Sequence, residues 1–575
     1  MDLKRWLPTT KKEMELRGWS GVDVVLFTGD AYVDHPSFGT AIIGRIIEDC
    51  GLKVAVVPQP DWHGDYRDFK KFGKPSMFFA VTAGVMDSMV NHYTAGKRLR
   101  HDDAYTPDGR YGARPDRATT VYCRILKELY PDVPIVIGGI EASLRRLAHY
   151  DYWDDEYKPS ILIESGADLL VYGMGEKVMR EVCKTFIEGG TIADCHKLRQ
   201  VGYVTGKYQP ADGEEVCMLK SFEECRSDKS VAVENFKVVE QESNKLNDTV
   251  LVQGTGECNI VIRPPFAPIS TEELDHVYEL PFTRLPHPKY KGKRIPAFDM
   301  IRWSVNTHRG CWGGCAFCTI SMHQGKFIVS RSEESVLKEV RKMTEDPDFK
   351  GYLSDLGGPS ANMYRMRGKD ENMCKRCMRP SCAFPTICKN MNTDHSALLH
   401  LYKAVDALPS VKKSFIGSGV RYDIAMHETG DDFIDRNNRD YIKELVVKHV
   451  SGRLKVAPEH TSEEVLKLMR KPSFSLFCEF KKQFDKINRE AGLRQQIIPY
   501  FISSHPGCTK RDMADLAEKV KKGLNFHLEQ VQDFTPTPMT YATEMYNAGI
   551  DPYTGRKVYV ARSHKEKEEQ KRYFF

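Results

Sequence analysis

The stretch Trp303-Ser-Val-Asn-Thr-His-Arg-Gly-Cys-Trp-Gly-Gly-Cys-Ala-Phe-Cys318 joins a short β-rich run to a glycine-rich loop with three cysteines. Thiolates at this spacing can hold three irons of a 4Fe-4S cluster and leave the fourth iron open to another ligand. Glycines in the loop let the backbone pass close to an inorganic core. The stretch therefore predicts an iron–sulfur site at Cys311, Cys315 and Cys318. A zinc site would need a fourth ligand, such as His308 or His323.

The same stretch opens a series of alternating strands and helices. Further strands are predicted at 352–356, 413–417, 454–457, 497–502 and 530–534, and helices at 333–343, 397–408, 440–449, 462–469 and 510–524. With the run at 303–307 this makes six βα-type strands without a seventh or eighth, which indicates an open, partial (βα)6 barrel. The cysteine loop then lies at the carboxyl end of the first strand, where barrel enzymes build their sites.

A separate alternating series fills the N-terminal part of the chain. Buried-strand patterns at 23–28, 53–57, 77–81 and 133–137 predict an α/β domain with a doubly wound parallel sheet. Glycines follow several strand ends, at Gly29, Gly84, Gly138–Gly139 and Gly173–Gly175. Taken singly they can be turn residues, but together on one edge they predict a ligand crevice.

These patterns divide the chain into four parts. Residues 1–183 form the doubly wound domain, and residues 184–296 form a connector with a β-rich insertion. Residues 297–550 form the partial barrel, which carries a cysteine-rich insertion at 360–395. Residues 551–575 form a charged tail, which is either a solvated helix or a frayed end. The run from Glu141 to Trp153 is either an amphipathic helix or a segment that meets the barrel mouth.

Composition sets the remaining bounds. The 575 residues carry 28% charged residues and a net charge of +5, which gives no indication of nucleic-acid binding. No apolar run reaches the roughly 18 residues of a membrane span, and no secretory segment is visible. Sixteen cysteines in such a chain indicate reduced thiols and metal sites, so a cytoplasmic protein without a membrane partner is expected.

A second cysteine group lies inside the predicted insertion. Cys374, Cys377, Cys382 and Cys388 fall within fifteen residues of a polar segment. Four thiols at this spacing suit an auxiliary iron–sulfur cluster or a tetrahedral zinc ion, and the residues do not choose between them. A reduced loop packed on the barrel is the alternative.

The Cys-x3-Cys-x2-Cys loop, with an aromatic residue before its last cysteine, resembles that of the radical S-adenosylmethionine (radical SAM) superfamily. The chain is also similar, over nearly its full length, to the YgiQ family of radical SAM proteins, through phrases such as Gly29-Asp-Ala-Tyr-Val-Asp-His-Pro-Ser-Phe-Gly39 and Tyr172-Gly-Met-Gly-Glu176. The resemblance implies S-adenosylmethionine binding at the barrel strand ends. The residues that match are Phe317, Asp355, Gly357, Gly358, Ser418, Arg421 and Glu459.

What the resemblance implies is reductive cleavage of S-adenosylmethionine to a 5′-deoxyadenosyl radical, with an electron donor such as flavodoxin or ferredoxin and an unknown substrate. A redox-sensing iron–sulfur protein without catalysis is an alternative, and cobalamin-dependent methyl transfer is another. The first domain resembles cobalamin-binding domains, but the Asp-x-His-x-x-Gly motif that supplies a histidine to cobalt is absent, since Asp34 and His35 are adjacent. Cobalamin is therefore possible but not favoured.

Overall fold

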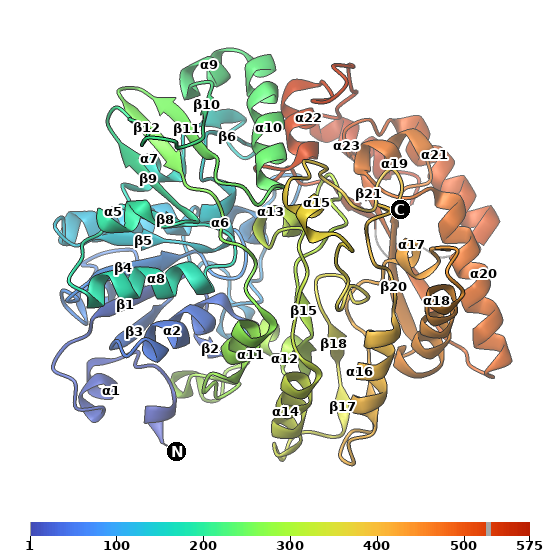
Figure 1. Cartoon of the computed structure of the whole chain (residues 1–575), viewed down its shortest axis with the longest axis horizontal. Helices are drawn as coiled ribbons and strands as arrows, with labels where there is room; N and C mark the ends of the chain where they lie inside the picture. Colours follow the sequence, from blue (N-terminus) through green and yellow to red (C-terminus); the bar gives the residue numbers. More distant parts are fainter. Residues whose placement is uncertain (1, 525–530, 575) are drawn as a thin grey trace.

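The computed structural model describes residues 2–524 and 531–574 and shows an N-terminal sheet domain beside a C-terminal barrel domain (Figure 1). The first five parallel strands of the sheet lie in the order β3-β1-β4-β5-β8. These strands are β1 (Val24–Thr28), β3 (Val54–Pro58), β4 (Phe78–Thr82), β5 (Ile135–Ile137) and β8 (Leu169–Val171). The prediction of a doubly wound parallel sheet is confirmed, and the strand order reverses between β1 and β4.

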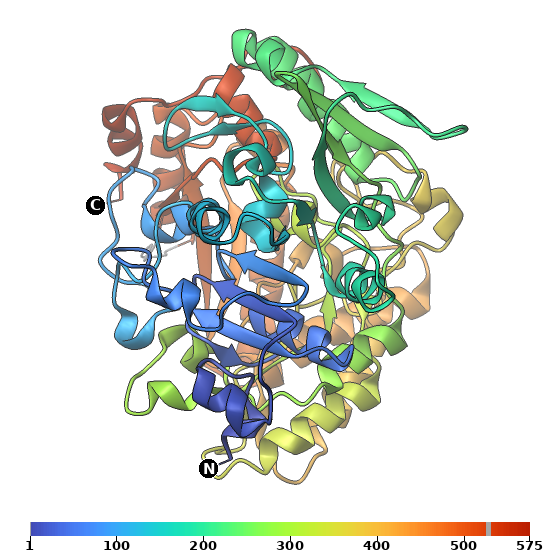
Figure 2. The same cartoon turned by 90° about the vertical axis from the view of Figure 1, so that its left-hand side faces the viewer.

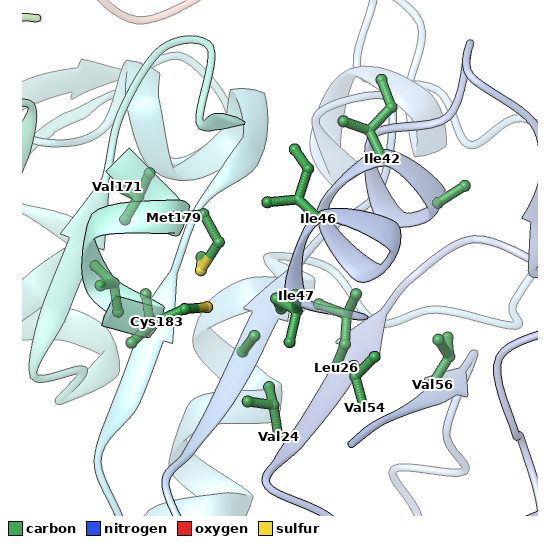
Figure 3. Packing of buried hydrophobic residues seen from close by; sticks show 14 of the residues in the cluster. Val24, Leu26, Ile42, Ile46, Ile47, Val54, Val56, Val171, Met179 and Cys183 are labelled. Carbon is green, nitrogen blue, oxygen red and sulfur yellow. The ribbon is translucent and has the colours of Figure 1, made fainter. Parts of the chain in front are cut away.

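Both faces of these strands are covered by helices. Val24 and Leu26 of β1 pack toward α2 (Gly39–Asp49) and α8 (Glu176–Ile187), and Figure 3 shows Ile46 and Ile47 of α2 and Met179 of α8 in this layer. The alternate residues, Val25 and Phe27, belong to the cluster that includes α5 (Ala118–Leu129) and α7 (Ile161–Ser165). Burial of both faces explains why the strands are continuously apolar in sequence.

The segment predicted as a connector adds four strands to this sheet. They are β9 (Val201–Thr205), β10 (Val216–Leu219), β11 (Val250–Thr255) and β12 (Cys258–Ile262), and they extend it to nine strands in the order β10-β11-β12-β9-β8. Figure 2 shows these green strands continuing from the blue parallel strands. Between β10 and β11 lie α9 (Phe222–Ser227) and α10 (Lys229–Ser243), and α10 contacts α22 (Tyr541–Ala548) at the end of the barrel domain.

The barrel domain follows the predicted strand series. Its strands are β14 (Ser304–Asn306), β17 (Tyr352–Leu353) with β18 (Asp355–Gly357), β19 (Lys413–Ser414), β20 (Arg453–Glu459), β21 (Gln496–Ser503) and β22 (Val531–Asp533). All pairings among them are parallel: β14 with β18, β17 with β19, and β20-β21-β22. The last predicted strand began at Gln530, which lies outside the described residues.

Five helices of the barrel domain correspond to predicted helices: α14 (Glu333–Thr344), α16 (Ser396–Asp406), α18 (Asp432–Glu444), α19 (Glu463–Met469) and α21 (Lys510–Glu518). Their bounds agree within a few residues, except that α18 begins eight residues before its predicted start. Helix α21 is followed by a π-helical turn, Lys519–Leu524. Helix α20 (Phe474–Glu490), which is longer than any of these, was not predicted. Three of its phenylalanines, Phe477, Phe480 and Phe484, are fully buried in the barrel core.

Two expectations about the chain's polar segments need correction. The run from Glu141 to Trp153 is not one helix: α6 (Gly139–Leu144) ends early and β6 (His149–Asp151) follows, which brings Tyr150 and Tyr152 against the end of the barrel domain. The tail does form a helix, α23 (His564–Lys571), but it is not merely solvated. Lys567 and Gln570 are buried, and Gln570 Nε2 donates to the carbonyl of Cys508 at 2.7 Å.

Among the described residues, no helix is both long enough and apolar enough to cross a membrane.

Candidate functional site

The three-cysteine loop lies between β15 (His308–Arg309) and the short helix α13 (Ile320–His323), directly after the first barrel strand. Gly310 and Gly314 have positive φ angles of 87° and 57°, a backbone region that favours glycine. Gly313 also has no room for a side chain, because an added Cβ would lie 2.5 Å from Arg421 and 3.3 Å from Cys311 Sγ. The loop glycines thus keep the backbone close to the thiols.

The half-buried thiols of this loop lie beside a cation. Arg421 Nη1 lies 3.5 Å from Cys315 Sγ, and Asp423 holds the guanidinium by an Nε–Oδ1 bond of 2.8 Å. Burial raises the pKa of Cys311 and raises that of Cys318 to about 12, and the neighbouring thiols add to both shifts. Arg421 opposes the shift at Cys311. A metal centre bound by these cysteines would take them in their thiolate forms.

Glu459 and Lys471 form a second charged pair near the loop. Glu459 ends β20 with a φ of 68°, and its carboxylate lies 3.6 Å from Lys471 Nζ. Burial raises the pKa of Glu459, and this carboxylate in turn contributes to the raised pKa of Cys318. The ends of barrel strands three and four therefore bring two cations and two carboxylates to the cysteine loop.

The predicted residues on strands two and three contact one another. Asp355 accepts hydrogen bonds from the amides of Gly417 at 2.8 Å and Ser418 at 3.1 Å, and from the Ser418 hydroxyl. An added Cβ on Gly357 would meet Ser418 Oγ at 2.7 Å. Asp355 thus ties the two strand ends together, and its direct contact with a ligand stays a prediction.

His308 closes the other side of this strand end. Its ring lies so near Gly358 that an added Cβ would be 2.6 Å away. Its two nitrogens are engaged by Thr307 Oγ1 at 2.8 Å and the Ser360 carbonyl at 3.0 Å. These partners leave the ring without a free nitrogen for the zinc ligation considered from the sequence.

Phe317 lies at the opposite side of the loop. Its ring meets that of His505 edge-on at 6.0 Å, and it packs with Ile502 at the end of β21. Its role as an apolar wall of a ligand site stays a prediction. His505 itself is buried and lies in the phrase Ser503-Ser-His505-Pro-Gly at the end of this strand.

The glycine-lined sheet edge forms a cavity. Its volume is about 470 Å³, within the roughly 300–1,000 Å³ typical of ligand sites. The sheet contributes Gly84, Gly138, Gly139, Gly173 and Gly175, and the barrel contributes Asn306, His308, Gly358 and Ile320. The predicted crevice is thus present, and the barrel strand ends and the helix after Cys318 form its other wall.

A buried ion pair joins the two domains at this cavity. Arg309 of β15 pairs with Glu176, the first residue of α8, and its Nε donates to Tyr278 Oη at 3.3 Å. All three residues line the cavity, as does His323, whose Nδ1 is buried without a hydrogen-bond partner. From the sequence, His323 is predicted only as a possible zinc ligand. Arg309 and Glu176 are 133 residues apart, so neither local sequence predicts that they pair.

The second cysteine group lies against the first. Cys374 is in α15 (Glu371–Lys375), and Cys377, Cys382 and Cys388 follow in a loop. The amide of Cys382 donates to the carbonyl of Trp312 at 3.0 Å. The two groups predicted separately therefore share one end of the barrel, where Figure 1 shows α15 and α13.

The fold and this cysteine loop define the chain as a radical SAM protein. The family model described as "Radical SAM N-terminal" matches residues 6–304, and a domain of unknown function, DUF3362, matches 529–574. The chain is 60% identical to a UPF0313 protein of Bacteroides thetaiotaomicron, covering 100% of this chain and 94% of the relative. It is 59% identical to one of Porphyromonas gingivalis, covering 100% and 90%. The chain belongs to the UPF0313 family, the YgiQ family predicted from its motifs.

Two radical SAM enzymes of known structure are among the proteins to which the chain is similar. TsrM from Kitasatospora setae, solved with cobalamin and a 4Fe-4S cluster, is 15% identical with a TM-score of 0.46, covering 90% of this chain and 74% of that chain. OxsB, solved with aqua-cobalamin and S-adenosylmethionine, is 10% identical with a TM-score of 0.49, covering 93% and 56%.

Proposed function

We propose that this chain holds a 4Fe-4S cluster through Cys311, Cys315 and Cys318 and reductively cleaves S-adenosylmethionine bound beside it. The observation that carries the proposal is the group of three half-buried cysteines at the first barrel strand end, with Arg421 Nη1 3.5 Å from Cys315 Sγ. When bound, the cluster would supply an open iron and an electron to the sulfonium.

The surrounding side chains suit the two charged groups of the ligand's methionine moiety. A methionine moiety carries one ammonium and one carboxylate, and the site offers carboxylates at Glu459 and Asp423 and cations at Arg421 and Lys471. Gly357 and Gly358 leave backbone exposed where a side chain would collide with Ser418 or His308. Phe317 adds an apolar wall that excludes water. Asp355 and Ser418 fix the strand ends that present these groups.

The experiment is anaerobic reconstitution, reduction with dithionite and measurement of 5′-deoxyadenosine from S-adenosylmethionine. We expect product from the wild type and none from Cys315→Ala. Cys478→Ala, which alters a half-buried cysteine on α20, serves as the matched control and keeps activity. Iron bound by the wild type without 5′-deoxyadenosine above the Cys315→Ala level would favour the redox-sensing alternative.

The cavity supports a second candidate, methyl transfer with cobalamin. It lies at the strand-order reversal of the sheet, where doubly wound folds bind cofactors, and borders the helix that follows Cys318. His35 is buried, but it does not line the cavity, so no histidine ligand to cobalt is expected from that loop. Reconstitution with hydroxocobalamin tests this candidate: a protein-bound corrinoid spectrum, with S-adenosylhomocysteine among the products, would support it. A spectrum without corrinoid bands would leave the cavity to the substrate.

A further inference from the structure

The cysteine-rich insertion packs directly on the three-cysteine loop. Besides the bond from Cys382 to Trp312, the Ser381 hydroxyl donates to the carbonyl of Gly313 at 2.6 Å. Gly314 lies so close to Ser381 that an added Cβ would be 2.8 Å from its Cα. A separate, surface-attached metal module would not need such close backbone contact with the loop of the first cluster.

The four thiols of the insertion run from the surface inward. Cys382 is buried and packs with Cys388, Cys311 and Trp312 in one apolar cluster. Cys374 and Cys377 lie at the outer side, next to Met373 and Met378, which are 56% and 48% exposed. One end of the group thus faces solvent, and the other faces a thiol of the first site.

These thiols lie near one another and near a buried cation. Backbone hydrogen bonds join the four residues in two pairs: the amide of Cys377 donates to the carbonyl of Cys374 at 3.1 Å, and the amide of Cys388 donates to the carbonyl of Cys382 at 2.8 Å. Lys326 is only 7% exposed and donates to the carbonyls of Cys377 at 2.9 Å and Arg379 at 3.3 Å. No carboxylate of the described residues pairs with it. A buried ammonium without a carboxylate partner suits an anionic group held by the thiols.

The position of this group favours an iron–sulfur cluster over a zinc ion. The insertion packs on the loop of the first site through Cys382 and Ser381. A zinc ion has no redox chemistry to offer such a neighbour, whereas an iron–sulfur cluster gains and loses single electrons.

We infer that Cys374, Cys377, Cys382 and Cys388 hold a second iron–sulfur cluster that passes electrons to the cluster at Cys311, Cys315 and Cys318. The relay depends on the proposed function, but the second cluster does not. In each step a reduced low-potential protein gives one electron to the second cluster, which is reoxidised as the first cluster is reduced by one electron. That electron is the one consumed when the sulfonium of S-adenosylmethionine is cleaved.

The outer rim indicates the kind of donor. Exposed basic residues lie along the segment that carries the solvent-facing thiols, namely Arg365, Arg367, Lys369, Lys375, Arg376 and Lys389. The exposed acids among them in sequence are Asp370 and Glu371, and Glu371 pairs with Arg367. This charge suits an acidic electron carrier with a flavin or iron–sulfur group.

The first test counts metal in the anaerobically reconstituted full chain. The wild type should hold about eight irons and eight sulfides, and Cys374→Ser/Cys377→Ser about four of each. Cys217→Ser/Cys478→Ser, which alters two half-buried cysteines of other elements, should match the wild type. Equal iron in the wild type and the Cys374→Ser/Cys377→Ser variant, or one zinc per wild-type chain, would overturn the second cluster. Cys315→Ser should lose the first cluster and keep the second, which separates this inference from the proposed function.

The second test concerns the relay and leaves all cysteines in place. Lys375→Glu/Arg376→Glu should slow reduction of the first cluster by flavodoxin hydroquinone at least about tenfold, with dithionite reduction unchanged. The matched control, Lys486→Glu/Arg489→Glu, reverses two exposed charges on α20. Electron paramagnetic resonance follows both clusters. Reduction of the first cluster by flavodoxin at the wild-type rate in the variant lacking Cys374 and Cys377 would exclude the relay.

Discussion

The guanidinium of Arg421 lies 3.5 Å from the sulfur of Cys315 while Asp423 holds its other side. This places a fixed positive charge against a loop that must carry negative charge when a cluster is bound. Asp423 is itself buried, so the arginine cannot turn away without leaving that carboxylate unpaired. The pair therefore orients the cation toward the cluster loop.

Replacing this cation should impair the chemistry more than cluster assembly. We expect Arg421→Met/Asp423→Asn, which removes both charges together, to lower 5′-deoxyadenosine formation at least about tenfold, because a charge-assisted contact contributes about 1.5–3 kcal/mol. Iron content should stay near the wild-type value, since three cysteines still bind the cluster. Arg439→Met, at an exposed arginine of α18, is the control. A wild-type rate in the double variant would show that Arg421 has no role at the site.

A methyl group at Gly358 should disturb the strand end beside the cluster. In Gly358→Ala the new Cβ would lie 2.6 Å from the His308 ring, which Thr307 and Ser360 hold in place. We expect lower S-adenosylmethionine binding, measured by equilibrium dialysis, and a thermal midpoint several degrees below the wild type. Gly419→Ala is the matched control, because no atom lies within 4 Å of its Cβ position. Should both variants bind alike, the strand end does not form part of the ligand site.

The sequence predicted the strands of both domains well because their signals are local. Apolar runs such as Val24–Thr28 and Phe78–Thr82 are short, buried on both faces and followed by glycine. The three-cysteine loop was equally legible, since ligand type and spacing lie within eight residues. Helix α20 was not predicted, although Phe477, Phe480 and Phe484 have helical spacing. The alternation of strands and helices in a six-strand barrel is complete without a second helix between β20 and β21.

Contacts between distant segments could not be predicted. The pairing of β9 with β8 and β12 depends on which strand edge is free, and this is decided by the whole sheet. Likewise, Arg309 and Glu176 belong to different domains, and the sequence around each residue does not predict that the two form an ion pair. The contact between Cys382 and Trp312 is of the same kind. The spacing of the cysteines predicts both cysteine groups, but it does not predict that the two groups lie next to each other.

The Arg309–Glu176 pair should stabilise the junction between the domains. Arg309→Met alone leaves the Glu176 carboxylate buried without its partner, which costs about 3–5 kcal/mol. We expect a clear fall in the thermal midpoint for this variant and recovery of much of it in Arg309→Met/Glu176→Gln, where no unpaired charge remains. Differential scanning calorimetry measures both. Equal midpoints for the single and double variants would show that charge pairing is not what holds this contact.

A buried carboxyl in the C-terminal segment should make stability depend on pH. Glu544 of α22 is 3% exposed, its Oε2 has no hydrogen-bond partner, and burial raises its pKa from 4.5 to about 8. Below pH 4.5 the group is protonated in both the folded and the unfolded chain. Between pH 4.5 and 8 the unfolded chain releases the proton while the folded chain keeps it, so folding stability falls as pH rises, by up to about 1.4 kcal/mol per pH unit.

The variant Glu544→Gln removes this pH dependence. Its thermal midpoint should exceed that of the wild type most at pH 8 and approach it near pH 5. Glu490→Gln, at an exposed position on α20, should follow the wild type at both pH values. A constant difference between Glu544→Gln and the wild type from pH 5 to 8 would mean that Glu544 does not titrate in this range.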